Sequence, residues 1–209
     1  MVVKTVLITG FEPFLEFNRN PTEIIANSLN GITIDSVRFI GKILPVKYDA
    51  AGKVLEEAIK ESSPDLIIGT GLAAGRAKIS VEKIAINYKY SESPDNAGKR
   101  VLGERIREGI PDGLFSRIRV EELVKVLNSI SIPAEISLSA GAYLCNYVMF
   151  VILIESKKLG IPGGFVHVPN DEQLSAMMYP KTYPSISIDT MKKAIIEIAK
   201  YEAKEAGHD

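Results

Sequence analysis

One cysteine and two histidines are the side chains of this chain best suited to nucleophilic and general acid–base chemistry. Cys145 lies in the segment Ser-Ala-Gly-Ala-Tyr-Leu-Cys-Asn, between a predicted strand and an apolar helix that begins around it. Because the free amides of a helix N-terminus stabilise an anion, this position favours the reactive thiolate. A lone cysteine is otherwise most often a small buried hydrophobic residue. The small residues ahead of Cys145 favour catalysis, because they let a substrate backbone approach closely.

His167 falls near the end of a strand predicted over 164–168, at the edge of an α/β sheet where active sites gather. The other histidine, His208, lies in a polar tail and is a poor candidate. A histidine in a strand is more often a hydrogen-bonded structural residue than a catalytic one. Cys145 and His167 would nevertheless form a natural pair of nucleophile and base.

Glu82 interrupts the apolar pattern of a strand predicted over 79–88. Counting by twos, it shares a face with Ile84, Ile86 and Tyr88, which places a carboxylate among inward-facing apolar side chains. A buried carboxylate is costly unless a polar or cationic group meets it. Two interpretations stay open: a surface glutamate exposed by a bulge, or a third catalytic residue that orients the imidazole.

Two further segments could line a binding site. Phe11 and Phe14 follow the first predicted strand, where they could belong to the core or wall a pocket. The segment 69–76, Gly-Thr-Gly-Leu-Ala-Ala-Gly-Arg, precedes a strand, whereas a dinucleotide-binding glycine motif opens a helix. We expect a loop from 71 to 76 whose backbone, around Leu72, lies close to a small ligand and is anchored by Arg76.

Strand-like runs alternate with amphipathic stretches along most of the chain. This alternation predicts an α/β sandwich with a mainly parallel or mixed sheet. The expected strands are 2–9, 37–46, 65–69, 79–88, 134–138 and 164–168, and the expected helices are 20–29, 49–62, 120–130, 146–159 and 188–206. The charged segment 91–113 is too irregular for a core element, and its length suggests a lid or an arm.

Length and composition exclude several classes of protein. With 209 residues, of which 46% are apolar, the chain suits one domain over 1–209. Its 25 basic and 26 acidic residues leave no basic excess, which argues against nucleic acid as a partner. The longest apolar run, 147–154, is too short for the roughly 20 residues of a membrane span, and the N-terminus does not read as a signal peptide. We therefore expect a cytoplasmic protein without a structural zinc site.

These segments together resemble the pyrrolidone carboxyl peptidase family, also called pyroglutamyl peptidase I, which consists of cysteine peptidases. The matching segments occur in the family's order and span nearly the whole chain; they are 6–14, 20–22, 71–76, 79–87, 94–98, 139–149 and 164–169. The resemblance implies an open α/β/α sandwich that assembles as a homotetramer and removes an N-terminal pyroglutamyl residue from peptides, with no cofactor and no metal. It also implies roles for individual residues, with Cys145 as nucleophile, His167 as base and then acid, and Glu82 as its orienting partner.

The implied reaction is acyl transfer through a thioester, with backbone amides near the start of the cysteine's helix receiving the oxyanion. An uncharged lactam suits a pocket of Phe11, Phe14, Leu72 and Arg76, whereas a free α-ammonium group would lose its hydration there. The chain has Leu15-Glu16 where the family usually has glycines and Leu72 where it often has a glutamine, and it departs from the family pattern at two further places. Glu92 stands where the family commonly has an arginine, and 170–173 lacks the family's second proline.

Two other classes of function stay open. A nucleotide-binding protein that uses the glycine segment would be stabilised by nucleotides and would be indifferent to alkylation of its thiol. A non-catalytic assembly module, derived from a hydrolase, would not turn over substrate.

Overall fold

A computed structural model describes residues 2–14 and 18–205, so that His208 lies outside the described residues. Seven strands form the main sheet, in the order β10-β5-β11-β4-β1-β3-β2. Their bounds are β1 (Lys4–Phe11), β2 (Thr33–Ile34), β3 (Val37–Leu44), β4 (Leu66–Leu72), β5 (Ile79–Glu82), β10 (Ala134–Ser137) and β11 (Gly163–Val168).

Most neighbouring strands of this sheet are parallel. The pairs β3–β1, β1–β4, β4–β11 and β5–β10 are parallel, whereas β5–β11 and β2–β3 are antiparallel. The expected mixed, mainly parallel sheet is therefore confirmed. The register places the ends of β1, β4 and β11 at one edge of the sheet, where the candidate residues gather.

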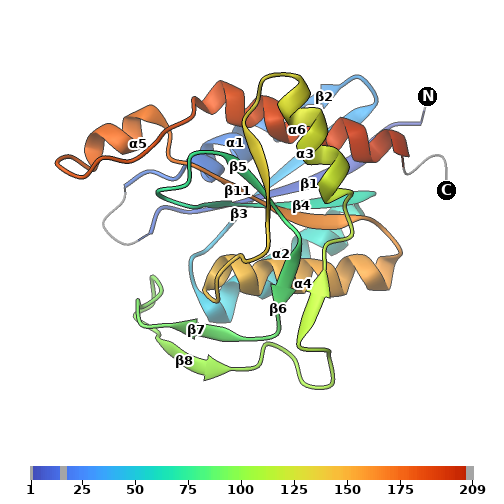
Figure 1. Cartoon of the computed structure of the whole chain (residues 1–209). Coiled ribbons are helices and arrows are strands. Elements are labelled where there is room, and N and C mark those ends of the chain that lie inside the picture. The colour runs from blue at the N-terminus through green and yellow to red at the C-terminus, as the bar shows by residue number, and fades with distance from the viewer. Residues whose placement is uncertain (1, 15–17, 206–209) are drawn as a thin grey trace.

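Helices cover both faces of the sheet (Figure 1). The helices are α1 (Pro21–Leu29), α2 (Tyr48–Ser62), α3 (Val120–Ser129), α4 (Leu144–Leu159), α5 (Glu172–Met177) and α6 (Ile188–Glu205). One apolar core lies between the sheet and α1, α3 and α6, and a second lies between the sheet and α2 and α4. The short helix α5 stands away from both layers (Figure 1). No helix within 2–14 and 18–205 is long and apolar enough to cross a membrane.

The prediction of one continuous strand over 79–88 is wrong. The chain leaves the main sheet after Glu82, and β6 (Ile84–Ile86) pairs instead with β9 (Gly113–Phe115) in a separate two-stranded sheet. Ile86 and Tyr88 are exposed, so Glu82 does not share a buried face with them. Alternation along one continuous strand was the wrong reason for placing Glu82 inside, although its side chain is fully buried.

The segment expected to be an irregular arm is partly regular. Strands β7 (Lys89–Ser91) and β8 (Val101–Glu104) form a second two-stranded sheet, and both small sheets lie on the α2–α4 side of the main sheet (Figure 1). The turn between β7 and β8 is ordered by Asp95, whose Oδ1 accepts hydrogen bonds from the amides of Ala97 and Lys99. Such short strands carry too little periodicity to be recognised in the sequence.

Candidate active site

Cys145 is the second residue of α4 and lies in its first turn. This helix begins at Leu144 rather than at the expected residue 146. It is apolar on nearly all sides, and its central residues Val148 to Leu153 are buried between the main sheet, α2 and the small sheets. A deeply packed helix thus holds the sulfur at a defined place beside the sheet edge.

The N-terminus of α4 differs from those of the other described helices. In α1, α2, α3, α5 and α6, a side chain accepts a hydrogen bond from an amide of the first turn or the N-cap; these acceptors are Asn20, Asp95, Glu202, Asp171 and Ser187. In α4 the N-cap residue Tyr143 makes no such side-chain bond. The amides around Cys145 are therefore available to an anion from outside the helix.

Gly71 allows β4 to approach the sulfur of Cys145. A Cβ atom at this position would lie 2.8 Å from Cys145 Sγ and 2.9 Å from the ring of Phe165. Both Gly71 and Leu72 belong to β4, so the loop expected over 71–76 begins only after Leu72. The glycine is needed because strand backbone, rather than a flexible loop, faces the thiol.

His167 and Glu82 come from the antiparallel strands β11 and β5. Ser80 pairs with His167 in the register, which places Glu82 diagonally across from His167 on the same face of the sheet. His167 Nδ1 lies 2.7 Å from Glu82 Oε1, and the two side chains are only 5% and 0% exposed. With Nδ1 held by the carboxylate, Nε2 is the ring nitrogen left to interact with Cys145.

The charges of these three groups support one another. Burial disfavours the imidazolium, but the negative charge of Cys145 and hydrogen bonds with Cys145 and Glu82 outweigh it and raise the pKa of His167 to about 9. Burial alone would likewise raise the pKa of Glu82, yet the hydrogen bond and charge of His167, with help from Ser137 and Arg76, hold it below its ordinary value. The carboxylate of Glu82 and the imidazolium of His167 are therefore both favoured at neutral pH.

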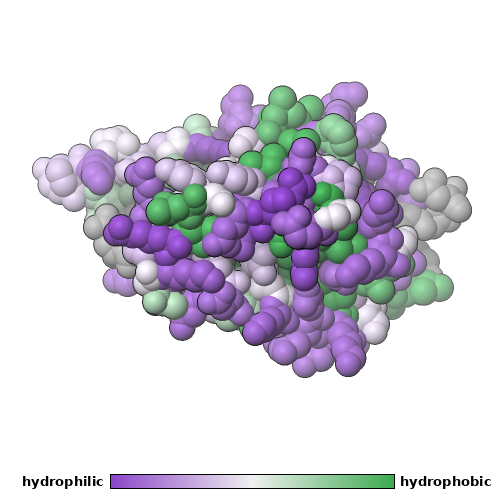
Figure 2. All heavy atoms as spheres, turned by 90° about the horizontal axis from the view of Figure 1, so that it is seen from below, coloured by the Kyte–Doolittle hydropathy of each residue, from purple (hydrophilic) through white to green (hydrophobic). Residues whose placement is uncertain are grey.

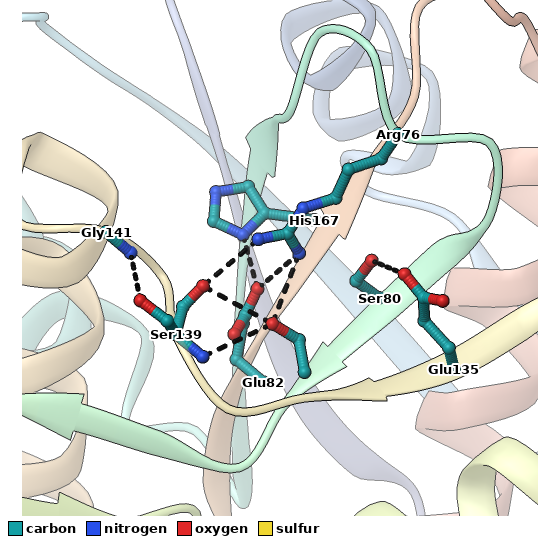
Figure 3. A network of polar contacts seen from close by, with 8 residues as sticks. Arg76, Ser80, Glu82, Glu135, Ser139, Gly141 and His167 are labelled. Atoms are coloured by element: carbon teal, nitrogen blue, oxygen red, sulfur yellow. Dashed lines mark hydrogen bonds and ion pairs between the residues drawn. The ribbon is translucent and has the colours of Figure 1, made fainter.

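Arg76 points to Glu82 rather than into the apolar pocket (Figure 3). Its Nη1 donates to Glu82 Oε1 over 2.8 Å and to Ser137 Oγ over 3.3 Å, and its Nη2 donates to the carbonyl oxygen of Ser139 over 3.0 Å. The expectation that Arg76 anchors its own loop fits these contacts. Its expected place among the substrate-binding residues does not, because its guanidinium is bonded to the protein.

A small apolar pocket opens beside Cys145. The pocket is lined by Phe11, Phe14, Asn20, Val46, Leu72, Tyr143, Leu144 and Cys145. Three of the four residues expected to bind substrate, namely Phe11, Phe14 and Leu72, thus line the same pocket as Cys145. Leu72 contributes its side chain, which is only 9% exposed, and not its backbone alone.

The turn between β7 and β8 lies beside this pocket and is hydrogen-bonded to residues at its edge. Asn96 Nδ2 donates to Glu12 Oε1 and to the carbonyl of Pro13, over 2.9 and 3.0 Å. The hydroxyl of Tyr143 donates to the carbonyl of Pro94 over 3.1 Å. Sequence reasoning assigned no role to these residues, although Pro94-Asp-Asn is a turn signal that pointed to an ordered loop.

The two further departures from the family pattern lie in different surroundings. Glu92 is exposed and accepts a hydrogen bond from the hydroxyl of Tyr90, over 3.0 Å. Asn170 is buried, and Asp171 caps α5 while forming an ion pair with Arg19. The segment 170–173 therefore starts a helix that sequence reasoning missed; Asp-Glu ahead of an apolar residue was the signal for it.

Comparison with known proteins gives a consistent result. A family model described as pyroglutamyl peptidase matches residues 4–205. A pyrrolidone-carboxylate peptidase of Saccharolobus islandicus is 51% identical over 191 residues, which cover 91% of each chain. The Pyrococcus furiosus enzyme of the same name is 47% identical over 166 residues, covering 78% of this chain and 80% of that one.

Solved structures agree with these sequence relationships. The pyrrolidone carboxyl peptidase of Thermococcus litoralis superimposes with a TM-score of 0.94 at 37% identity, covering 99% of this chain and 96% of that one. The Pyrococcus furiosus enzyme superimposes with a TM-score of 0.93 at 40% identity, covering 96% of this chain and 99% of that one.

Proposed function

The chain belongs to the pyroglutamyl peptidase family, and we propose that it removes an N-terminal pyroglutamyl residue from peptides by using Cys145, His167 and Glu82. One observation carries the assignment of these residues. The cysteine in the first turn of α4 interacts with an imidazole whose other nitrogen is held by a buried carboxylate over 2.7 Å. This is the arrangement of nucleophile, acid–base group and orienting residue that acyl transfer requires.

The reaction begins from the thiolate–imidazolium pair. Cys145 Sγ forms a bond to the pyroglutamyl carbonyl carbon, and the C–N bond breaks as His167 gives its proton to the leaving amine. The neutral imidazole then takes a proton from water, whose oxygen attacks the thioester carbon. Pyroglutamate leaves, and the thiolate and the imidazolium are restored.

The negative charge on the carbonyl oxygen is received by the uncapped N-terminus of α4. Five other described helices satisfy their first amides with a side chain, whereas Tyr143 does not do this for α4. Amides that are already oriented stabilise the developing charge without the cost of reorganising solvent.

The pocket selects the lactam ring by its lack of charge. Phe11, Phe14 and Leu72 offer apolar walls and no carboxylate, so a ring without charge is accommodated while an ammonium group would lose its hydration without compensation. The closest test of this selection is a pair of substrates with similar five-membered rings, a pyroglutamyl and a prolyl fluorogenic amide.

The wild-type protein is expected to release fluorophore from the pyroglutamyl amide and not from the prolyl amide, which carries a charged ring nitrogen. Cys145→Ala should release none, and circular dichroism should show that this variant is folded. Because Cys145 is the sole cysteine of the chain, one equivalent of iodoacetamide should remove all activity, and a pyroglutamyl ligand should slow the labelling. Turnover by the folded Cys145→Ala variant would reject the proposed nucleophile.

Assembly and location form a second part of the proposal. We assign the whole chain to one peptidase domain that forms a homotetramer, as the family resemblance implies. Exposed apolar side chains on the two small sheets and between β6 and β7 support assembly; they are Ile86, Tyr88, Tyr90, Leu102 and Phe115. Groups of hydrophobic residues lie between hydrophilic residues on this side of the molecule (Figure 2).

Light scattering should give the mass of four chains, and replacing Leu102 and Phe115 by glutamate should lower it; a monomeric wild type would reject the assembly. We also place the enzyme in the cytoplasm, because its single cysteine cannot form an intramolecular disulfide and a reducing compartment keeps such a thiol free.

A further inference from the structure

We propose that Arg76 is a positioning residue for the reaction: it holds Glu82 against His167 and, at the same time, holds the loop that leads to Cys145. This inference rests on the proposed function, because it concerns the same site. The hydrogen bonds of Arg76 do not reach the thiol, and Arg76 does not line the apolar pocket, so its effect passes through the groups that it binds.

The first step of the argument is the way in which Glu82 is held. Its Oε1 accepts from both His167 Nδ1 and Arg76 Nη1, over 2.7 and 2.8 Å. Its Oε2 is buried and makes no hydrogen bond with the described residues, and the Ser137 side chain helps to hold its pKa down. A single oxygen therefore meets both cations, and removing Arg76 would leave the carboxylate with His167 as its only charged partner.

The second step is the loop ahead of the nucleophile. Arg76 Nη2 donates to the carbonyl oxygen of Ser139, and Nη1 donates to Ser137 Oγ at the end of β10. Residues 138–143 connect that strand to α4, whose first turn carries Cys145. One guanidinium thus ties the loop that presents the oxyanion-binding amides to the carboxylate that orients the base (Figure 3).

The third step is charge. The titratable groups nearest to Arg76 in the site are Glu82 from β5, His167 from β11 and Cys145 from α4. Two ion pairs lie further out on the neighbouring strands and on α3; they are Lys78–Glu135 and Lys83–Glu121. A cation lowers the pKa of every group near it, so its removal should raise the pH range in which the site works.

These contacts require an arginine. A lysine would keep the positive charge, but a single ammonium group cannot reproduce the planar fork that reaches Glu82, Ser137 and Ser139 from two nitrogens. The charge effect and the positioning effect can therefore be separated by comparing Arg76→Met with Arg76→Lys.

The test measures the pH profile of kcat/KM for both variants and for Lys83→Met as the matched control. Lys83 follows Glu82 in the chain but pairs with Glu121 over 2.8 Å, so the control removes an equal charge without touching the site. Arg76→Met should lower kcat about tenfold. It should also move the acid limb of the kcat/KM profile upward by about half a pH unit to one pH unit, because Arg76 is partly exposed and its charge is therefore partly screened. Arg76→Lys should lower kcat with a much smaller pH shift, and Lys83→Met should change neither.

A second readout does not depend on turnover. The rate at which iodoacetamide alkylates the sole cysteine is measured against pH for the same variants, and its profile should move in the same direction in Arg76→Met. If the wild type turns over no pyroglutamyl amide, the proposed function fails, while the alkylation profile still decides the role of Arg76. Arg76→Gln replaces Arg76→Met if the latter does not fold.

A double mutant identifies the route of the effect. If Arg76 acts largely through Glu82, Arg76→Met should lower kcat much less in the Glu82→Gln variant than in the wild type. A purely structural anchor would lower kcat or stability equally on both backgrounds and leave both pH profiles in place. That result, or an equal shift in Lys83→Met, would overturn the proposal.

Discussion

Two fully buried carboxylates in this molecule each pair with an arginine, but their pKa values are shifted in opposite directions. Glu82 lies beside Arg76 at the active site, and Glu202 of α6 lies beside Arg119 at the start of α3, each at 0% side-chain exposure. The pKa of Glu202 is raised, because burial outweighs its hydrogen bonds with Arg119. The pKa of Glu82 is lowered, because His167 adds a hydrogen bond and a positive charge that overcome burial.

The difference shows that a neighbouring arginine does not by itself lower the pKa of a buried carboxylate. The second cation decides, and at the active site that cation is the imidazolium of His167, stabilised in turn by Cys145. Glu202 instead has Glu122 nearby, whose charge favours protonation. The pKa of Glu82 is thus held down by the imidazole that its carboxylate contacts.

The largest effect is expected from removing the imidazole, which is the second cation beside Glu82. His167→Ala should lower kcat/KM by about 10,000-fold or more, because the leaving amine then has no proton donor and the water has no base. Without the imidazolium, Glu82 should titrate at a raised pKa, as Glu202 does. Turnover of the pyroglutamyl amide is the measurement, with circular dichroism to show that the variant is folded; activity near that of the wild type would reject the assigned role.

Replacing each carboxylate by its amide should separate their roles. Glu82→Gln should reduce kcat/KM by about 100-fold or more while leaving residual turnover, because the imidazole is then poorly oriented and its charge is unsupported. Glu202→Gln should keep kcat/KM within about twofold but lower the free energy of unfolding by about 1–3 kcal/mol, since it weakens a hydrogen-bonded charge pair. Kinetics and urea unfolding of the two variants check this contrast, which would fail if Glu202→Gln were the less active one.

The alkaline limb of the pH profile tests the charge of His167. Because the pKa of His167 is raised to about 9, kcat/KM should fall above about pH 9, by about tenfold per unit, as the imidazolium loses the proton that the leaving amine needs. A decline that begins near pH 6.5, the ordinary pKa of histidine, would contradict the thiolate–imidazolium pair.

The smallest expected effect is on stability. The folded protein binds the proton of Glu202 more tightly than the unfolded chain does, so the resulting stabilisation is complete below the ordinary pKa of 4.5 and is lost as the pH rises through the folded value. Glu82 acts in the opposite sense, and its contribution is lost as the pH falls through its lowered pKa. Urea unfolding as a function of pH should show a shallower decline above pH 4.5 in Glu202→Gln than in the wild type; parallel curves would refute the raised pKa.

Local signals in the sequence were enough to locate the elements that carry Cys145 and His167. Cys145 was expected at the start of an apolar helix and His167 near the end of a strand, and the structure places both there. Helix α1 was expected from its cap, and Asn20 Oδ1 does accept from the Thr22 amide over 3.0 Å. Capping and periodicity act between residues that are close in the chain, and they can therefore be read locally.

The order and direction of the strands depended on the tertiary structure. β5 is inserted between β10 and β11 and runs antiparallel to β11, and this insertion brings Glu82 beside His167, 85 residues away in the chain. The prediction of one continuous strand over 79–88 missed this arrangement, because the break between β5 and β6 at Lys83 leaves no periodic signal in the sequence. Pairing between distant strands is set by the packing of the whole sheet.

The amino-acid sequence by itself thus determined the α/β class, the cap of α1 and the residue types that could do chemistry, since each depends on composition or on neighbours along the chain. Only the tertiary structure decided what those residues meet: Arg76 lies on Glu82 and not in the pocket, and the turn at 94–96 docks beside the loop after β1. The physical reason is that a charged side chain takes the partner that compensates its burial, and that partner is brought to it by the folding of distant segments.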